Sequence, residues 1–385
     1  MKIAILTTDN REAYRQYAAP TPFFGTAPTA LFQGFAALPN LEVHILSCTQ
    51  QPMSSPPKLA ENIWFHSLYV PKVGWLRAAY SGCILAVRQK LKEIQPDIVH
   101  GQGTERDCAI SSVFSRYPNV ITIHGNMAEL ARIFHAHCGT FNWCAAKLEN
   151  FTLPRTSGVF CNSAYTQSLV SSRSKRTWLV PNPIRCSFFA PPIRSNLPFE
   201  VPILLVVGVI SSRKRQLELL KILIQLRQQT THFQVKFIGS YGEDPYGKSF
   251  LNLLNSKEND GWATWLGVLD EPALILCMDT AHALIHFPHE EAFGLVVAES
   301  LARGLKLFAS KVGGIRDIAS GVPDAELFDP EDWEGLQKAL FHWIQNPTLA
   351  SYLSRELIES RYHPNGIAAR HVEIYREILS ASKLS

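Results

Sequence analysis

Two glutamates bracket the segment Glu291-Ala-Phe-Gly-Leu-Val-Val-Ala-Glu299, which carries a glycine near its centre. An apolar strand is expected to end at Phe287, and a helix is expected to start after Gly294. The first N–H groups of a helix have no partner within the helix, so those of Phe293, Gly294 and Leu295 would suit the oxygens of a diphosphate. Because Gly294 has no side chain, phosphates could approach the backbone closely there.

The spacing of the two carboxylates argues against a simple hydrolytic pair. If the segment were helical throughout, eight residues would separate the glutamates by about 12 Å. A carboxylate pair that hydrolyses a glycosidic bond stands roughly 5 to 9.5 Å apart. We therefore expect them to hold two ends of an elongated ligand, such as the sugar hydroxyls and the ribose hydroxyls of a nucleotide sugar. The alternative is a solvated helix start with a favourably placed acid.

A basic loop follows a second predicted strand, in Val206-Val-Gly-Val-Ile-Ser-Ser-Arg-Lys-Arg-Gln-Leu217. Cations at the start of a helix oppose its dipole, so three of them there would be costly unless an anion is bound. We expect Lys214 and Arg213 to neutralise a diphosphate, and the planar fork of Arg213 is well suited to that task. A merely solvated basic face is the alternative.

Taken together, these segments resemble family four of the retaining glycosyltransferases, which have the fold called GT-B. The Glu-x7-Glu pattern at Glu291–Glu299 is that family's motif, and Leu305–Ile318 resembles its next strand and Gly-Gly turn. Trp265–Val268 and Val180–Ile184 match in the expected order. The resemblance implies that a nucleoside-diphosphate sugar is the donor and that its base lies near Gly267 to Leu269.

The basic loop shows one agreement and one departure from the family. Lys214 falls on the family's lysine, whereas Val209 stands where the family has an arginine. Arg213 is our candidate for the missing phosphate contact.

In the first half of the chain, the resemblance points to two further positions. Gly25, in Pro22–Leu31, falls in the family's glycine-bearing first loop near the donor phosphate. The alternative there is a loop anchored by Phe23 and Phe24. His124 falls on a histidine that the family uses near the transferred sugar, and the alternative is a structural histidine. His100, at the end of the preceding predicted strand, is a weaker candidate for a contact to the sugar.

The elements that would position these residues alternate between short apolar strands and helices, which is typical of parallel α/β sheets. Proline interrupts the alternation at Val180–Ile184, and further prolines follow at 191, 192, 198 and 202. We predict two Rossmann-like domains facing each other across a cleft, an acceptor-side domain over 1–182 and a nucleotide-sugar domain over 183–365. Residues 366–385 are predicted to form a helix that packs back on the first domain.

Composition narrows the function further. The net charge is +4 among 385 residues, too mild for a dedicated nucleic-acid binder. The eight cysteines form no Cys-x-x-Cys pair, and no Asp-x-Asp pair occurs, so we expect no metal and no cofactor beyond the nucleotide sugar. No apolar run is long enough to span a membrane. We expect a cytoplasmic protein, with peripheral contact to lipid head groups at the basic cluster of Arg173, Lys175 and Arg176 as a minority alternative to solvated surface.

The function predicted is that of a retaining hexosyltransferase in polysaccharide or glycolipid synthesis. UDP-glucose or UDP-N-acetylglucosamine is the expected donor, and a carbohydrate or lipid-linked hydroxyl is the expected acceptor. The leaving phosphate would accept the acceptor's proton, with His124 near the sugar, although Glu291 as a nucleophile stays open. The alternatives are a sugar-nucleotide epimerase of the same fold and a non-catalytic sugar-nucleotide-binding protein.

Overall fold

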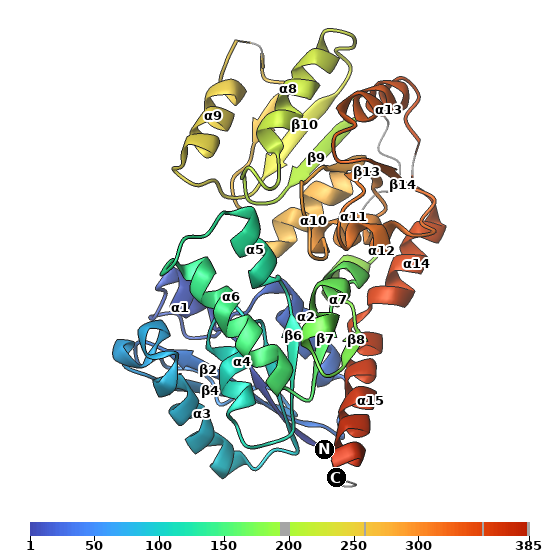
Figure 1. The fold of residues 1–385 in the computed structure, drawn as a ribbon. Coiled ribbons are helices and arrows are strands. Elements are labelled where there is room, and N and C mark those ends of the chain that lie inside the picture. The colour runs from blue at the N-terminus through green and yellow to red at the C-terminus, as the bar shows by residue number, and fades with distance from the viewer. Residues whose placement is uncertain (193–200, 258, 349, 383–385) are drawn as a thin grey trace. The chain divides into compact units, whose positions relative to one another are not determined.

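The computed structural model describes residues 1–192, 201–257, 259–348 and 350–382. The chain divides into two compact units, of which the first comprises Met1–Cys186 with Tyr362–Ser385 and the second Ser187–Arg361 (Figure 1). Pro198 of the predicted linker and Lys383 of the predicted last helix lie outside the described residues.

An eight-stranded sheet, ordered β3-β4-β2-β1-β5-β6-β7-β8, forms the centre of the first unit. All its pairings are parallel except that of β3 with β4. The chain begins at β1, adds β2 and β4 on one side and β5 to β8 on the other, so the strand order reverses between β1 and β5. The strands are β1 (Lys2–Leu6), β2 (Glu42–Thr49), β3 (Lys58–Ala60), β4 (Ile63–Tyr69), β5 (Ile98–Gln102), β6 (Asn119–Ile123), β7 (Gly158–Cys161) and β8 (Thr177–Leu179).

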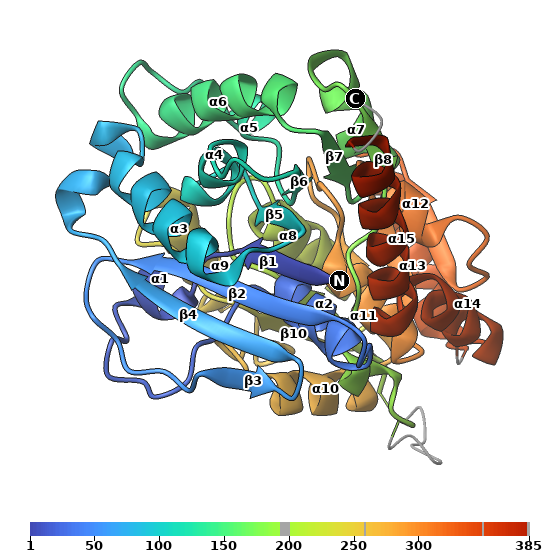
Figure 2. The ribbon, with the colours of Figure 1, turned by 90° about the horizontal axis from the view of Figure 1, so that it is seen from below.

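Helices cover both faces of this sheet (Figure 2). Side chains alternate between the faces of a strand, so Ile3 and Ile5 pack with α2 and α15, whereas Ala4 and Leu6 pack with α3. Apolar runs buried on both faces are typical of parallel sheets. The helices are α1 (Asn10–Tyr14), α2 (Thr26–Ala36), α3 (Ser81–Ile94), α4 (Asp107–Val113), α5 (Met127–Ile133), α6 (Phe141–Thr152), α7 (Ala164–Val170) and α15 (Pro364–Ser382).

The last helix, α15, belongs to the first unit, as predicted for 366–385. It lies against α2, where Gly34 leaves no room for a side chain: a Cβ atom there would stand 2.2 Å from the Pro364 carbonyl oxygen. Ile367, Ala368 and Ile374 complete the contact by joining the apolar core. Residues from the end of the chain therefore finish the core that its first strand begins.

A six-stranded, all-parallel sheet, ordered β11-β10-β9-β12-β13-β14, forms the centre of the second unit. The strand order reverses between β9 and β12. The strands are β9 (Ile203–Val207), β10 (Gln234–Ile238), β11 (Ala263–Trp265), β12 (Ala283–His286), β13 (Lys306–Ser310) and β14 (Ala325–Phe328). The helices are α8 (Gln216–Arg227), α9 (Pro245–Leu254), α10 (Glu271–Thr280), α11 (Leu295–Ala302), α12 (Ile315–Ala319), α13 (Trp333–Gln345) and α14 (Tyr352–Tyr362).

The prediction of two Rossmann-like sheets is confirmed, but some element boundaries were wrong. The sequence pattern predicts one helical stretch over Met127–Glu149, but two helices form there, because His135 and Gly139 take positive φ angles of 46° and 82° between them. The pattern also predicts a helix over Leu76–Ile94, but α3 begins only at Ser81, after two short 3₁₀ turns. Strands β3, β4, β8 and β14 were not predicted.

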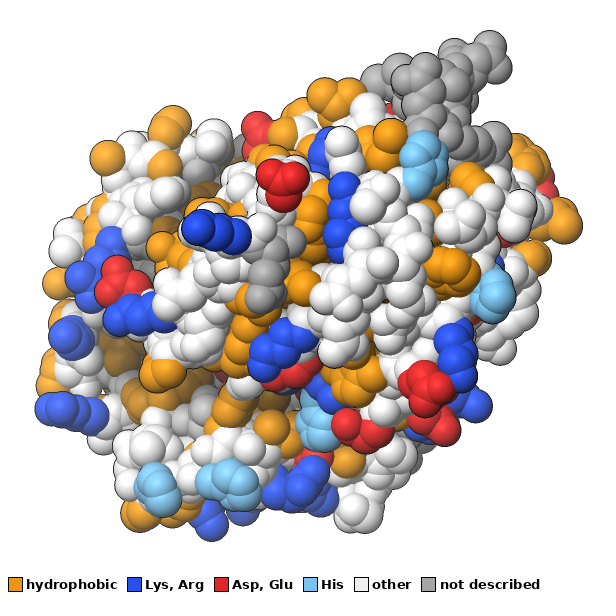
Figure 3. All heavy atoms as spheres, turned by 90° about the horizontal axis from the view of Figure 1, so that it is seen from above, with side chains coloured by type: hydrophobic (Ala, Val, Ile, Leu, Met, Phe, Trp, Pro, Cys, Tyr) orange, Lys and Arg blue, Asp and Glu red, His pale blue; other side chains and the backbone are white. Residues whose placement is uncertain are grey.

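Two members of the basic cluster expected on the surface have acidic partners. Arg173 lies 3.2 Å from Glu149, and Arg176 pairs with Glu377 while it stacks 4.6 Å from the Trp178 ring. The face drawn in Figure 3 likewise mixes basic and acidic side chains. No helix in the described part of the chain is long and apolar enough to cross a bilayer.

Candidate active site

The basic residues after β9 lie in the loop before the next helix and not in the first turn of that helix. Helix α8 begins at Gln216, and Arg215 caps it with a positive φ of 60°. Each cation has a carboxylate of this chain beside it: Arg213 lies 3.1 Å from Glu290, Lys214 pairs with Glu291, and Arg215 lies 3.1 Å from Glu331. The expectation that only a bound anion could offset these charges was therefore wrong.

Glu291, which follows β12, contacts both Lys214 and His286. Its carboxylate accepts from Lys214 and lies 3.1 Å from Nε2 of His286, the last residue of β12. The Gly314 N–H, in the turn after β13, donates to the Glu291 carbonyl at 3.1 Å. Burial by itself would raise the pKa of Glu291, but the charge of Lys214 and the contact with His286 hold that pKa well below its ordinary value. Glu291 is thus a fixed, buried anion.

The protonation of the neighbouring groups follows from the same environment. Burial, with the charge of Lys214, lowers the pKa of His286, so its imidazole is neutral at pH 7. Burial raises the pKa of Glu290 although Arg213 opposes the shift. Among the described residues, the Lys214 ammonium has Glu291 as its one hydrogen-bond partner, which leaves two of its three N–H groups for a ligand.

Gly294 caps the helix that follows this loop. Its φ of 100° is a left-handed conformation that side chains strongly disfavour, and the helix proper, α11, starts at Leu295. A Cβ on Gly314 would stand 2.6 Å from the Cα of Phe293, so the Gly-Gly turn after β13 supports the cap closely. The N-terminus of α11 is therefore built as sequence predicts. However, Glu291 lies outside the helix, so the 12 Å estimate does not apply.

The other predicted residues of the second unit occupy neighbouring loops. Gly267 has a φ of 70° and accepts a hydrogen bond of 2.8 Å from the Gly239 N–H, which brings the loops after β10 and β11 together. Leu269, two residues on, is half-buried. Glu299 is buried within α11, and Val209 is 56% exposed.

All these loops lie at the carboxyl edge of one parallel sheet. Lys214 follows β9 and Glu291 follows β12, and these are the two strands between which the strand order reverses. Ligands of open α/β sheets bind in the crevice at such a reversal. The second unit thus gathers a cation, a fixed carboxylate and a helix N-terminus where a ligand is expected.

In the first unit, His124 follows β6 and is held by a chain of polar contacts. Its Nε2 lies 2.8 Å from Oε1 of Gln102, and the amide nitrogen of Gln102 lies 3.3 Å from Nε2 of His100. The Tyr375 hydroxyl, from α15, lies 2.5 Å from Nδ1 of His100, and Thr122 lies 2.6 Å from the other ring nitrogen. His100 is therefore a buried supporting residue, and His124 stands at the outer end of the chain of contacts.

Burial sets the charge of these histidines. It lowers the pKa of His124 to about 4, although a hydrogen bond with Asn182 opposes the shift. It lowers the pKa of His100 well below its ordinary value. Both rings are neutral at pH 7. The Nε2–H of His124 donates to Oε1 of Gln102, so Nδ1 of that ring is a hydrogen-bond acceptor.

Gly25 caps α2 with an ordinary φ of −57°, and a Cβ there would meet Pro28 only at 3.6 Å. Neither backbone strain nor close packing therefore requires glycine at this position. The neighbouring Phe23 is 37% exposed and stacks on Tyr14, whereas Phe24 packs against Phe32 and Phe65.

Two family models match the chain, and between them they cover most of it. The model described as Glycosyltransferase Family 4 matches residues 30–188, and that described as Glycosyl transferases group 1 matches residues 192–359. The chain belongs to glycosyltransferase family 4. The family and the GT-B fold predicted from sequence are confirmed.

Solved structures share the fold of this glycosyltransferase over its whole length. Sucrose-phosphate synthase from Thermosynechococcus elongatus superposes with a TM-score of 0.78 at 20% identity, over 99% of this chain and 100% of that one. The Anabaena protein HepE, solved in complex with UDP-glucose, gives 0.70 at 17% identity over 99% and 100%. N-acetyl-alpha-D-glucosaminyl L-malate synthase from Bacillus anthracis is 23% identical over 145 residues, 37% of this chain and 38% of that synthase.

Several residues that build the glycosyltransferase's site were not predicted from sequence. His286 and Glu290 pair with Glu291 and Arg213 respectively, and Gln102 holds His124. His286 could have been found, because it lies next to the end of a predicted strand, five residues before Glu291. Gln102 and Tyr375 carry no such signal, since 273 residues separate them in the chain.

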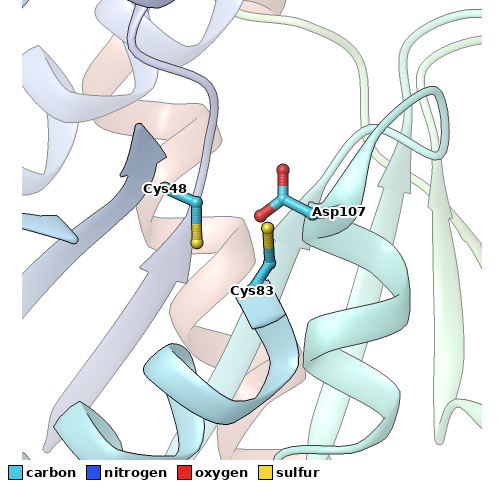
Figure 4. Close-up of side chains that lie close together, drawn as sticks. All are labelled: Cys48, Cys83 and Asp107. Atoms are coloured by element: carbon cyan, nitrogen blue, oxygen red, sulfur yellow. The ribbon is translucent and has the colours of Figure 1, made fainter. Parts of the chain in front are cut away.

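One further cluster of the glycosyltransferase could in principle hold a metal ion. Cys48 on β2, Cys83 on α3 and Asp107 on α4 point toward one another, with their ligand atoms within 4.8 Å (Figure 4). Burial raises the pKa of Asp107, while a hydrogen bond from the Cys48 thiol opposes the shift. The groups thus already satisfy one another by hydrogen bonding, and three ligands are fewer than a structural zinc site uses.

Proposed function

We propose that this glycosyltransferase moves a hexose from a UDP-sugar, UDP-glucose or UDP-N-acetylglucosamine, to an acceptor hydroxyl with retention of configuration. The observation that carries the proposal is the cluster of Lys214, Glu291 and His286 beside the α11 N-terminus, at the strand-order reversal. HepE, in complex with UDP-glucose, and a trehalose-6-phosphate protein from E. coli, bound with UDP-2-fluoro glucose, share the fold and support a UDP-linked donor.

The proposed donor contacts are made partly by charged side chains and partly by backbone N–H groups. Two N–H groups of Lys214, with Arg213, bind the diphosphate together with the N–H groups near Phe293, Gly294 and Leu295. Arg213 and Lys214 are balanced by Glu290 and Glu291, so side chains alone bring no net positive charge to the phosphates. The helix N-terminus must therefore supply much of the stabilisation of the leaving diphosphate.

The remaining roles concern the sugar, ribose and base. Glu291 binds the sugar hydroxyls, Glu299 the ribose, and the loop at Gly267 and Leu269 the base. In the transfer, the bond from the anomeric carbon to the diphosphate breaks, the acceptor oxygen attacks the same face, and the leaving phosphate takes the acceptor's proton. His124, neutral and held by Gln102, hydrogen-bonds the transferred sugar. Glu291 already has two partners, Lys214 and His286, which favours its binding role over that of a nucleophile.

The proposal is tested with a panel of UDP-, GDP- and ADP-sugars. A ligand at 100 times its Kd should stabilise the fold by about 2.7 kcal/mol, so the melting temperature should rise with UDP-glucose or UDP-N-acetylglucosamine and much less with the others. Transfer is expected to be metal-independent, so EDTA should leave the rate unchanged. An equal shift with every nucleotide sugar would refute the assignment of the base.

The two alternatives give different products. An epimerase converts donor without acceptor, which NMR of a donor-only incubation would reveal. A non-catalytic binder, for which Val209 in place of the family arginine is the one hint, would bind donor without transferring or slowly hydrolysing it.

A further inference from the structure

A cavity of about 650 Å³ opens in the first unit, and its lining residues do not include His124 or the residues that contact it. Its walls are mainly apolar, formed by Trp75, Leu76, Tyr80 and Phe141. Arg106 also lines it and follows β5, whereas Gln50 follows β2. Since β1, between them, is where the strand order of this sheet reverses, the cavity lies where parallel sheets bind ligands.

Three cations line this apolar cavity, and two of them, Lys72 and Arg77, are exposed at its rim. Within the described part of the chain, the side chains of Lys72, Arg77 and Arg106 make no hydrogen bond or ion pair. Elsewhere in the first unit, buried arginine is fully engaged: Arg11 pairs with Asp9 at 2.8 Å. Cations around an apolar surface are complementary to a ligand that is itself both acidic and apolar.

The charge of Arg106 acts on its two neighbours in the chain, Glu105 and Asp107, where it opposes the rise in pKa that burial causes. Glu12 accepts the Gln50 N–H at 2.8 Å and is buried. Asp107, next to Arg106, faces the thiols of Cys48 and Cys83 (Figure 4), and burial raises its pKa. Arg106 thus lies near two carboxylates but forms an ion pair with neither, since Glu105 lies against Gly103 and Asp107 faces the thiols.

The wall of the cavity is closely packed and not a loose loop. A Cβ on Gly74 would stand 2.8 Å from the Cα of Gly82, so the turn before α3 lies directly on the start of that helix. Trp75 is 7% exposed, and its indole N–H donates to the Val70 carbonyl at 3.0 Å. The apolar wall is thus preorganised, which lowers the cost of binding.

We propose that this cavity binds the acceptor, and that the acceptor is an anionic amphiphile. Its apolar portion packs against Trp75, Leu76 and Phe141, and its phosphate or other acidic group faces Arg106, with Lys72 and Arg77 at the exposed rim. This inference names the acceptor class and rests on the proposed function.

The test uses decyl phosphate below its micellar concentration as the probe, titrated into the full chain and followed by calorimetry. Decyl glucoside supplies the same tail without charge, and inorganic phosphate supplies the charge without a tail. Decyl phosphate should bind at least about tenfold more tightly than either, because only it satisfies both parts of the cavity. Equal binding of the two decyl compounds, or of decyl phosphate and inorganic phosphate, would overturn the proposal.

Two substitutions test whether decyl phosphate binds in this cavity. Arg106→Gln should weaken decyl phosphate binding about tenfold, as expected for loss of a charged hydrogen bond, and leave decyl glucoside unchanged. Lys92→Gln is the matched control, since it removes an exposed cation from the far end of α3, about 16 Å along the helix from Ser81. Loss of the same size in Lys92→Gln would show that only the overall charge matters and would contradict the site.

UDP-glucose binding, measured on the same variants, separates this inference from the proposed function. Both variants should bind UDP-glucose like the parent chain, which also shows that they fold. If the parent chain binds UDP-glucose but not decyl phosphate, the acceptor inference fails and the proposed function stands. If it binds decyl phosphate but no nucleotide sugar, the proposed function fails, and with it the assignment of this cavity to an acceptor.

Discussion

At the scale of single residues, charge balance decides how the candidate site can work. Lys214 and Glu291 were predicted as separate contacts to two parts of a donor, but they form one ion pair with His286 beside it. A buried pair of this kind is costly to break from one side only, because the remaining charge loses its partner. Each member is therefore both a candidate ligand contact and a support for the other.

Lys214→Ala should lower affinity for UDP-glucose about tenfold to a hundredfold, because a charged hydrogen bond to the diphosphate is lost and Glu291 is left without its cation. Lys214→Arg should recover part of the affinity. Calorimetry with UDP-glucose measures both. Lys221→Ala, which removes an exposed cation from α8, is the control and should change nothing. Unaltered affinity and turnover in Lys214→Ala would show that the phosphate assignment is wrong.

Gly294→Ala should destabilise the second unit by about 1–2 kcal/mol, because the backbone there has a φ of 100°. Donor binding should weaken as well, since the cap orients the first N–H groups of α11. Urea unfolding and calorimetry measure the two effects. Gly366→Ala, in α15 with open space around it, should instead be neutral or stabilising by about 0.5–1 kcal/mol. Comparable losses in the two variants would contradict the role of the left-handed cap.

At the scale of elements, α15 contributes both to the core and to the candidate site. It packs on α2 at Gly34 and places Tyr375 against His100, which lies under Gln102 and His124. Burial raises the pKa of Tyr375 well above its ordinary value, so its hydroxyl stays protonated. The last helix thus helps to position His124, which follows β6, through the contacts of His100 and Gln102 on β5.

Tyr375→Phe should lower the free energy of unfolding by about 1–3 kcal/mol, because Nδ1 of buried His100 loses its hydrogen-bond partner. The position of His124 depends on this support, so kcat should fall while affinity for UDP-glucose stays unchanged. Urea unfolding, calorimetry and a transfer assay give the three values. Tyr352→Phe, at a position 70% exposed, is the matched control. A fall in stability with kcat intact would limit Tyr375 to a purely structural role.

At the scale of the whole molecule, the two units differ in how they should respond to acid. Burial lowers the pKa of five histidines, of which His66, His100, His124 and His371 lie in the first unit and His286 in the second. A histidine that stays neutral when folded but protonates when unfolded makes the unfolded chain bind more protons, so stability rises with pH over that interval.

The first unit should therefore be fully stable above about pH 6.5 and lose stability as the pH falls toward 4, where His66, His124 and His371 titrate. Of the five histidines, His286 lies in the second unit, which should therefore lose less of the stability that they contribute over the same window. Urea unfolding between pH 4 and 7, with hydrogen exchange to distinguish the units, measures the difference. His66→Gln should flatten the dependence of the first unit. A second unit that weakened more than the first would contradict this account.

The sequence by itself determined the fold class and the main site segments. Apolar runs such as Ile203–Val207 specify buried parallel strands, and glycine at position 294 specifies a left-handed cap before α11, because these signals act over a few neighbouring residues. The family followed from several such segments in order, and the comparisons confirm it.

Only the tertiary structure decided which residues meet. The partners of the basic loop follow β12 and β14, whose carboxyl ends share an edge with that of β9 only after the sheet is assembled. Glu290, Glu291 and Glu331 therefore could not be assigned to Arg213, Lys214 and Arg215 from spacing. Tyr375 reaches His100 across 275 positions for the same reason. Local pattern sets each element, but the electrostatics of a site arises from side chains that the parallel sheet brings to one edge.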